Sequence, residues 1–268
     1  MNKLDNDYQN LLKEVLNRGV NKFDRTGTGT KSIFGEQIRH NMSDGFPILT
    51  TKKVAFKTMV TELKWFLKGD TNIKYLQDNN CKIWDGDYKK SGRTDGGLGP
   101  IYGYQWRNHS RYGVQYDQIS NLIDNLINNP SSRRHIVNSW NIDMLDQMTL
   151  PPCHYVFQCY VNEGELSLMW HQRSVDLFLG LPFNISSYGL LLLLLCEATG
   201  YTPGTLIGTL GDTHLYNNHL DAAKTQLHRE GYALPNIKLS NVNVLDGEFD
   251  VELVNYKHEP VIKAPLSN

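Results

Sequence analysis

The chain reads HYVFQCYVNEGELSLMWHQR from residue 154 to residue 173. Two runs of strand-forming residues, 154–161 and 166–173, flank an Asn-Glu-Gly turn at 162–164, and this pattern predicts a β-hairpin. The strands of a hairpin run antiparallel, so we expect antiparallel pairs in the sheet of this protein.

Outside the hairpin, further strand and helix patterns are interleaved. Strand patterns occur near Leu206 and at 32–40, 135–140 and 249–256. Apolar residues at helical spacing predict helices at 8–15, ended by Gly19, at 56–68, and at 116–126, ended by Pro130. We therefore expect an α+β fold with one large mixed β-sheet covered by helices. No repeat or composition break divides the sequence, so residues 1–268 are interpreted as a single domain.

Bulk properties exclude several classes of protein. The net charge of -1 argues against a broad basic surface for nucleic acid, although a few arginines could still hold a small phosphate. The polar N-terminus lacks the apolar run of a signal peptide. The six leucines from Leu190 to Leu195 are too short for a membrane span, which needs roughly 20 apolar residues, so they indicate a buried core helix. Four cysteines without metal-ligand or disulfide spacing favour a reduced, cytoplasmic protein without a metal.

Cys153 is the first candidate for chemistry. It lies in Leu-Pro-Pro-Cys-His, residues 150–154, where a loop becomes a strand. Two prolines would hold the backbone extended and give the thiol a fixed position. Nearby cations would favour the thiolate and make it a nucleophile. The alternative is an ordinary buried cysteine, which is our interpretation of Cys159 and Cys196.

Several arginines could bind a phosphate group. Arg133 and Arg134 follow Pro130-Ser131-Ser132, Arg173 precedes Ser174, and Arg25 opens a Gly-Thr-rich stretch. Guanidinium groups match phosphate oxygens in pairs, and a serine hydroxyl adds a donor. Each of them could equally be a surface arginine, and the Gly-Thr stretch a flexible turn.

Other polar side chains stand among apolar neighbours. Glu62 falls on the inner face of its predicted helix, where a carboxylate needs partners or a function, so it is a candidate general acid or base or else lies at a solvated helix edge. Asn184 occupies a predicted loop-to-helix junction, where it could pair with a uracil edge or cap a helix. His214 and Tyr216 in the segment 211–216 could bind a hydroxyl or form a core turn.

Together these segments closely resemble the thymidylate synthase family, nearly end to end. The strings that carry the resemblance are DRTGTGT, FPILTTKK, ELKWFLKGDTN, LGPIYGYQWR, SRRHIV, LPPCHYVFQ, QRSVDLFLGLPFNISSYGLL, GDTHLYNNH and IKAP. The resemblance implies reductive methylation of dUMP to dTMP, with 5,10-methylenetetrahydrofolate as co-substrate and no metal. It also implies a homodimer packed sheet against sheet, with shared active sites.

The resemblance assigns roles to individual residues. Cys153 would add to C6 of dUMP, Glu62 would organise proton transfers, and Tyr102 would assist removal of the C5 proton. Asn184 would recognise the uracil ring. Asp176 would also be a catalytic residue and would face the folate. The remaining dUMP-binding residues would be Arg25, Gln172, Arg173, Ser174, His214 and Tyr216, with Arg133 and Arg134 from the partner subunit. The remaining folate-binding residues would be Lys52, Trp84, Gly180, Phe183 and Ala264.

Three positions depart from the family pattern. Ala55 stands where a histidine is common, Asp87 where a second tryptophan is usual, and Leu266-Ser267-Asn268 where relatives commonly finish with an aliphatic residue. All three would cluster around the folate. They keep open a dUMP hydroxymethylase, which would let water add to the same intermediate. A non-catalytic nucleotide- or RNA-binding regulator is a third interpretation.

Overall fold

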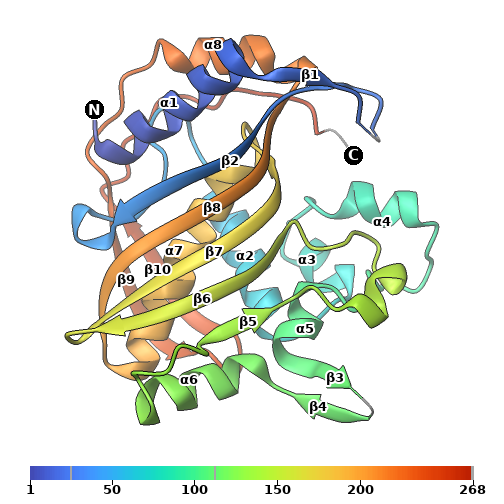
Figure 1. Ribbon diagram of the computed structural model, residues 1–268, viewed down its shortest axis with the longest axis vertical. Coiled ribbons are helices and arrows are strands. Elements are labelled where there is room, and N and C mark those ends of the chain that lie inside the picture. Colours follow the sequence, from blue (N-terminus) through green and yellow to red (C-terminus); the bar gives the residue numbers. More distant parts are fainter. Residues whose placement is uncertain (25, 112, 267–268) are drawn as a thin grey trace.

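The computed structural model describes residues 1–24, 26–111 and 113–266, and its centre is a six-stranded mixed sheet (Figure 1). The strand order is β1-β2-β8-β7-β6-β5. Only the β7–β8 pair of this sheet is parallel, and the other neighbours are antiparallel. The strands are β1 (Val20–Lys22), β2 (Thr30–Asn41), β5 (Ile136–Asn138), β6 (His154–Asn162), β7 (Glu165–Asp176) and β8 (Thr202–Tyr216). The predicted α+β class and large mixed sheet are confirmed.

The predicted hairpin is the pair β6–β7. Asn162 pairs with Glu165, so Glu163 and Gly164 form a two-residue turn in which both φ angles are positive. Such a turn matches the twist of the two strands, and glycine adopts positive φ without steric cost.

Helices and two small hairpins complete the fold. The α-helices are α1 (Lys3–Arg18), α2 (Phe56–Leu67), α3 (Ile73–Asp78), α4 (Asp85–Ser91), α5 (Tyr102–Asn108), α6 (Gln118–Asn128), α7 (Gly180–Thr199) and α8 (Leu220–Leu227). The 3-10 helices are η1 (Met42–Asp44), η2 (Ile142–Gln147) and η3 (Asn217–His219). The hairpins pair β3 (His109–Arg111) with β4 (Val114–Tyr116) and β9 (Asn236–Asn243) with β10 (Glu248–Val254).

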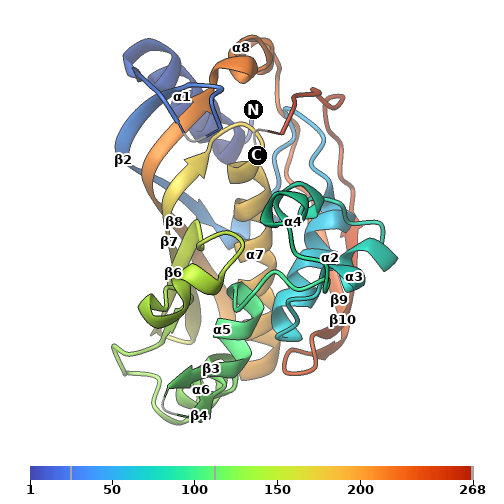
Figure 2. The ribbon, with the colours of Figure 1, turned by 90° about the vertical axis from the view of Figure 1, so that its right-hand side faces the viewer.

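Helix α7 forms the middle layer of the molecule. It packs along one face of the sheet, with α2 and the β9–β10 hairpin beyond it (Figure 2). Five of its six consecutive leucines are fully buried, as the sequence predicted for a core helix. By length and composition alone α7 would pass for a membrane-spanning helix, but 72% of its apolar window is buried inside the protein.

The opposite face of the sheet is covered by no α-helix in the part of the chain that the structure describes (Figure 2). This open face exposes the large apolar side chains Phe34, Ile136 and Tyr160. Apolar side chains gathered on one face of a monomer are typical of a surface that binds another protein.

Some predicted boundaries are wrong. The helix predicted from residue 116 begins at Gln118, because the Asp117 side chain caps it by accepting the Ser120 N–H at 2.9 Å, and Tyr116 belongs to β4. The strand predicted at 135–140 is only Ile136–Asn138, and the one at 249–256 lies in the separate β9–β10 hairpin. Asn184 lies inside α7 rather than at its start.

Candidate active site

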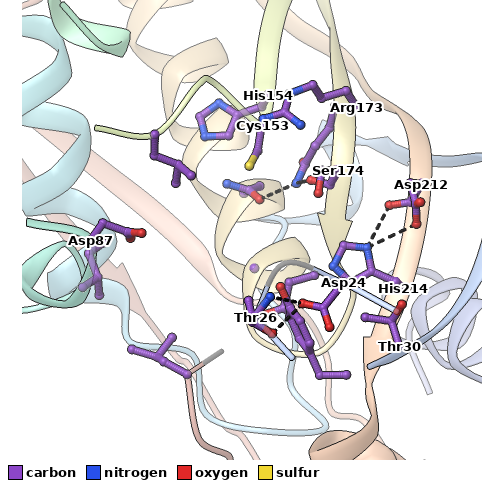
Figure 3. Close-up of a pocket in the computed structure, with 18 of the residues that line it drawn as sticks. Asp24, Thr26, Thr30, Asp87, Cys153, His154, Arg173, Ser174, Asp212 and His214 are labelled. Atoms are coloured by element: carbon purple, nitrogen blue, oxygen red, sulfur yellow. Dashed lines mark hydrogen bonds and ion pairs between the residues drawn. The ribbon is translucent and has the colours of Figure 1, made fainter. Parts of the chain in front are cut away.

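A polar cavity of about 450 Å³ opens where the carboxyl ends of β7 and β8 meet the start of α7. Helix α2, the start of α4 and the loop after β1 form its other sides. Figure 3 shows Cys153 with its sulfur pointing into this space, between Asp87 on one side and Asp212 and His214 on the other.

Cys153 is held by its backbone on two sides. Its N–H donates to the phenol oxygen of Tyr102 at 2.7 Å, and its carbonyl accepts the N–H of Arg173 at 2.8 Å. The residue comes immediately before β6, as the sequence predicted, and its side chain is half-buried. The thiol therefore has a fixed position and access to the cavity.

Arg173 is fixed by the same loop. Its guanidinium donates to the carbonyls of Pro151 and Pro152, each at 2.9 Å, and lies 5.3 Å from the centre of the Trp140 ring. A cation beside a thiol favours the thiolate form that acts as a nucleophile. Arg173 and Ser174 both line the cavity, where they could also bind an anion.

Glu62 projects from α2 into the cavity lining and is only 7% exposed. Burial raises the pKa of its carboxyl to about 7, against a smaller opposing effect of the hydrogen bond from Trp84 Nε1 at 2.7 Å. A carboxyl with this pKa can both give and take protons near neutral pH. The prediction that Glu62 lies on the inner face of its helix is confirmed.

His154 also lines the cavity, although no sequence pattern identified it. Its ring stacks on Tyr102 with 4.3 Å between ring centres, and Nδ1 contacts the Tyr188 phenol at 2.8 Å. Burial lowers the pKa of His154 to about 3, so the ring stays neutral. Its position directly after Cys153 is the signal that could have identified it.

A chain of three side chains orients Asn184. Trp170 Nε1 donates to Gln172 Oε1 at 3.2 Å, which leaves Gln172 Nε2 as a donor. That amide nitrogen donates to Asn184 Oδ1 at 3.1 Å and to the Ser174 carbonyl at 3.1 Å. Gln172 thereby sets which way the Asn184 amide faces.

Asp212 organises the opposite side of the cavity. Its carboxylate accepts from Lys22 Nζ at 2.7 Å and from Ser32 Oγ at 2.6 Å, and it lies 3.4 Å from His214 Nδ1. Burial opposes ionisation, but the hydrogen bonds from Lys22 and Ser32 outweigh it and keep the pKa of Asp212 below its usual value. No sequence pattern identified Lys22 or Asp212 as site residues. They come together because β1 pairs with β2 and β2 pairs with β8.

The loop between β1 and β2 is organised by Asp24. Its carboxylate accepts the N–H of Thr26 at 2.9 Å and that of Gly29 at 2.7 Å. Although burial opposes ionisation, bonds from Thr26 and Gly29 keep the pKa of Asp24 below its usual value. Arg25, predicted to bind phosphate, lies outside the described residues.

The structure brings most of the predicted site together. Twelve predicted residues line the cavity: Glu62, Trp84, Tyr102, Cys153, Gln172, Arg173, Ser174, Asp176, Gly180, Asn184, His214 and Tyr216. Of the three positions that depart from the family pattern, two contribute to the cavity lining, through Asp87 and Leu266. Ala55 is exposed and lies outside the cavity, and residues 267–268 are not described. Within the described residues no group of three or more His, Cys, Asp or Glu side chains could hold a metal ion.

Five predicted residues lie outside this lining. Arg133 and Arg134 are exposed, and Phe183 and Ala264 pack half-buried against the core. Lys52 is 5% exposed, donates to the Phe178 carbonyl and lies 3.6 Å from the centre of the Phe178 ring. Burial lowers the pKa of Lys52 to about 7. In this conformation its ammonium faces the protein interior.

One cavity is lined by a thiol, an oriented amide and a carboxyl whose pKa burial raises to about 7, and these are groups that a group-transfer enzyme for a small polar substrate needs. A family model described as thymidylate synthase matches residues 6–268, nearly the whole chain. The chain therefore belongs to the thymidylate synthase family, whose members are folate-dependent one-carbon transferases that bind dUMP.

Proposed function

We propose that this protein converts dUMP to dTMP, with 5,10-methylenetetrahydrofolate as donor of both the one-carbon unit and the hydride. The observation that carries this proposal is the presence of Cys153, Glu62 and Asn184 in the lining of one cavity. The reaction needs a nucleophile, a proton carrier and a group that recognises uracil, and these three side chains match those needs.

In the proposed mechanism the Cys153 thiolate donates its electron pair to C6 of the uracil, which makes C5 nucleophilic. Asn184 holds the ring by accepting from N3–H and donating to O4, in the orientation that Gln172 imposes. Glu62 and Tyr102 handle the protons, including the one that leaves C5. Cys153 leaves C6 at the end, so the enzyme is regenerated. The reduced folate supplies the one-carbon unit and the hydride.

Nucleotide and folate would occupy different parts of the cavity. Arg173 and Ser174 would bind the phosphate, and His214 and Tyr216 the sugar hydroxyl. Trp84, Asp176 and Gly180 would face the folate, and all three belong to the same lining.

Asp87 supports a second candidate function, hydroxymethylation of dUMP. Its carboxylate lines the cavity at a position where the family usually has a tryptophan. A carboxylate attracts water, and water at that place would compete with hydride for the one-carbon unit. The two candidates share every step up to that point.

We also propose that two copies of the chain form the active enzyme. Arg133 and Arg134 are exposed and lie outside the cavity of their own subunit, and the open face of the sheet exposes Phe34, Ile136 and Tyr160. Packing the two open faces together would bury these apolar side chains and allow each arginine pair to reach the partner's phosphate.

The deciding experiment is mass spectrometry of the nucleotide formed from dUMP and 5,10-methylenetetrahydrofolate, with dihydrofolate followed by absorbance. Methylated nucleotide and dihydrofolate in equal amounts would support the synthase. A hydroxymethylated nucleotide together with tetrahydrofolate would instead support dUMP hydroxymethylation, the second candidate function. Cys153→Ser should abolish either product, with Cys196→Ser, buried outside the cavity, as the control. If the parent protein binds dUMP but forms neither product, the result would favour a non-catalytic nucleotide-binding regulator.

A further inference from the structure

His219 ends the short helix η3, three residues after Tyr216, and is completely buried. Its ring lies 5.5 Å from the Tyr216 ring and 5.6 Å from the Phe178 ring, measured between ring centres. A buried imidazole is costly unless its two nitrogens have partners or a function. The proposed reaction does not use this residue.

One ring nitrogen of His219 contacts the C-terminal segment, residues 259–266. Nε2 lies 2.7 Å from the carbonyl oxygen of Pro265. A carbonyl can only accept, so Nε2 must carry the proton and donate it. The next residue, Leu266, lines the active-site cavity.

The other ring nitrogen faces the opposite way. Nδ1 is buried, has no hydrogen-bond partner among the described residues, and lies 3.8 Å from Oδ1 of Asp176. That oxygen accepts the N–H groups of Phe178 and Leu179, each at 3.0 Å, so Asp176 is itself held in place. The ring therefore fills the space between a fixed carboxylate of the cavity lining and the C-terminal segment.

The C-terminal segment reaches this point along a series of hydrogen bonds. The Glu259 N–H donates to the Thr50 carbonyl at 2.8 Å, and Arg229 donates to the Pro260 carbonyl. Five residues after Pro260, the bond from His219 holds Pro265. These contacts hold the segment against the rest of the protein. The bond from His219 to Pro265 determines where the next residue, Leu266, joins the cavity lining.

The geometry points to His219 as a positioning residue that fixes the C-terminal segment against Asp176 and so sets the folate side of the cavity. This inference rests on the proposed function, which puts the folate beside Asp176. Loss of the Nε2 donor would release Pro265 and displace Leu266. Folate use should suffer, whereas dUMP contacts at Arg173, Ser174 and Asn184 should not.

The test compares three substitutions. His219→Phe keeps a planar ring among Phe178 and Tyr216 but removes the donor. His219→Gln places an amide nitrogen near the position of Nε2 and restores the donor. His40→Phe is the matched control, because His40 is also buried and its Nε2 contacts a backbone carbonyl, that of Gly45, at 2.8 Å, outside the cavity.

The first measurement is the rate at which carboxypeptidase releases Leu266 from the unliganded protein. Loss of one hydrogen bond should speed release about tenfold in His219→Phe. Release should stay within about threefold of the parent rate in His219→Gln and in His40→Phe. This readout is independent of the reaction that the enzyme catalyses, so it remains valid if the proposed function fails.

The second measurement separates the two substrates. His219→Phe should raise the KM for 5,10-methylenetetrahydrofolate about tenfold and leave the Kd for dUMP within about twofold, and His219→Gln should recover most of the loss. Leu266 release in His219→Phe no faster than in His40→Phe would overturn the inference. Equal defects in His219→Phe and His219→Gln would also overturn it, because the imidazole would then serve only the fold.

Discussion

The phenol oxygen of Tyr102 accepts a hydrogen bond from the backbone N–H of Cys153 at 2.7 Å, across 51 residues of sequence. This bond ties the start of α5 to the loop that carries the thiol. Arg173 holds the Cys153 carbonyl from the other side, so the nucleophile is placed by contacts with two separate elements.

Tyr102→Phe should therefore impair catalysis more than binding. The variant keeps the ring stacked on His154 but leaves the Cys153 N–H without its acceptor. We expect kcat to fall about 10- to 100-fold, with the Kd for dUMP within a few-fold of the parent value. Steady-state kinetics and equilibrium dUMP binding test this prediction. An unchanged kcat would show that Tyr102 does not position the thiol.

Glu62→Gln should remove an ionisation near pH 7 from the pH profile of kcat/KM. Burial raises the pKa of Glu62 from 4.5 to about 7, so the folded protein holds a proton that the unfolded chain releases between those pH values. The free energy of unfolding should therefore fall as pH rises through this window, and this fall should shrink in the variant. Activity should decrease about 10²- to 10⁴-fold. Profiles and melting temperatures at pH 5 and 8 test both effects, and a titration near pH 7 that persists in the variant would assign it to another group.

Asn184→Asp should shift substrate preference from dUMP toward dCMP. Gln172 Nε2 would still donate to a carboxyl oxygen at position 184, so the side chain keeps its orientation. A protonated carboxyl could donate to N3 of cytosine and accept from its amino group. The ratio of kcat/KM values for the two nucleotides should change by at least about tenfold. An unchanged ratio would refute the uracil-reading role.

Arg133→Ala and Cys153→Ser proteins should each be inactive alone and recover activity when mixed and refolded. Arg133 is exposed and lies outside the cavity of its own subunit, so we expect it to serve the partner's site. Random pairing makes about half of the dimers mixed, and each of these has one intact site, so about a quarter of the parental activity should return. Proven heterodimers without activity would contradict shared sites.

Lys52→Met should change how stability depends on pH. Burial lowers the pKa of Lys52 from 10.5 to about 7, so between those values the unfolded chain binds a proton that the folded protein lacks. Lys52 therefore makes the free energy of unfolding rise with pH in this window, by on the order of a few kcal/mol. The variant should lose that rise. Denaturant titrations at pH 7 and 10 test this, and parallel behaviour of both proteins would mean that Lys52 stays charged.

Local patterns predicted much of the fold. The turn at Glu163-Gly164, the end of α1 at Gly19 and the buried leucines of α7 each depend on neighbouring residues, and each is confirmed. The wrong boundary at Tyr116 arose because its apolar ring fits a helical pattern, whereas the Asp117 cap and pairing with His109 place it in β4.

Contacts between distant segments limited what could be predicted of the site. The inner position of Glu62 followed from helical spacing, but its bond to Trp84 depends on how α4 packs. Lys22 and Asp212 are 190 residues apart and come together only because β1 pairs with β2 and β2 pairs with β8. The burial of Lys52 under Phe178 likewise depends on packing that no local pattern encodes.

The parallel pairing of β7 with β8 has an evolutionary consequence. Because the two strands run the same way, Ser174 lies beside Asp212 and Asp176 beside His214 at the carboxyl ends of both strands. Helix α7, which connects the two strands in the sequence, adds Asn184. Much of the proposed nucleotide-recognition surface therefore sits in one uninterrupted stretch, residues 165–216, while Cys153 and Glu62 lie upstream of it. A single recombination event within the gene could exchange base preference as a block and leave the nucleophile and the proton carrier of the recipient in place.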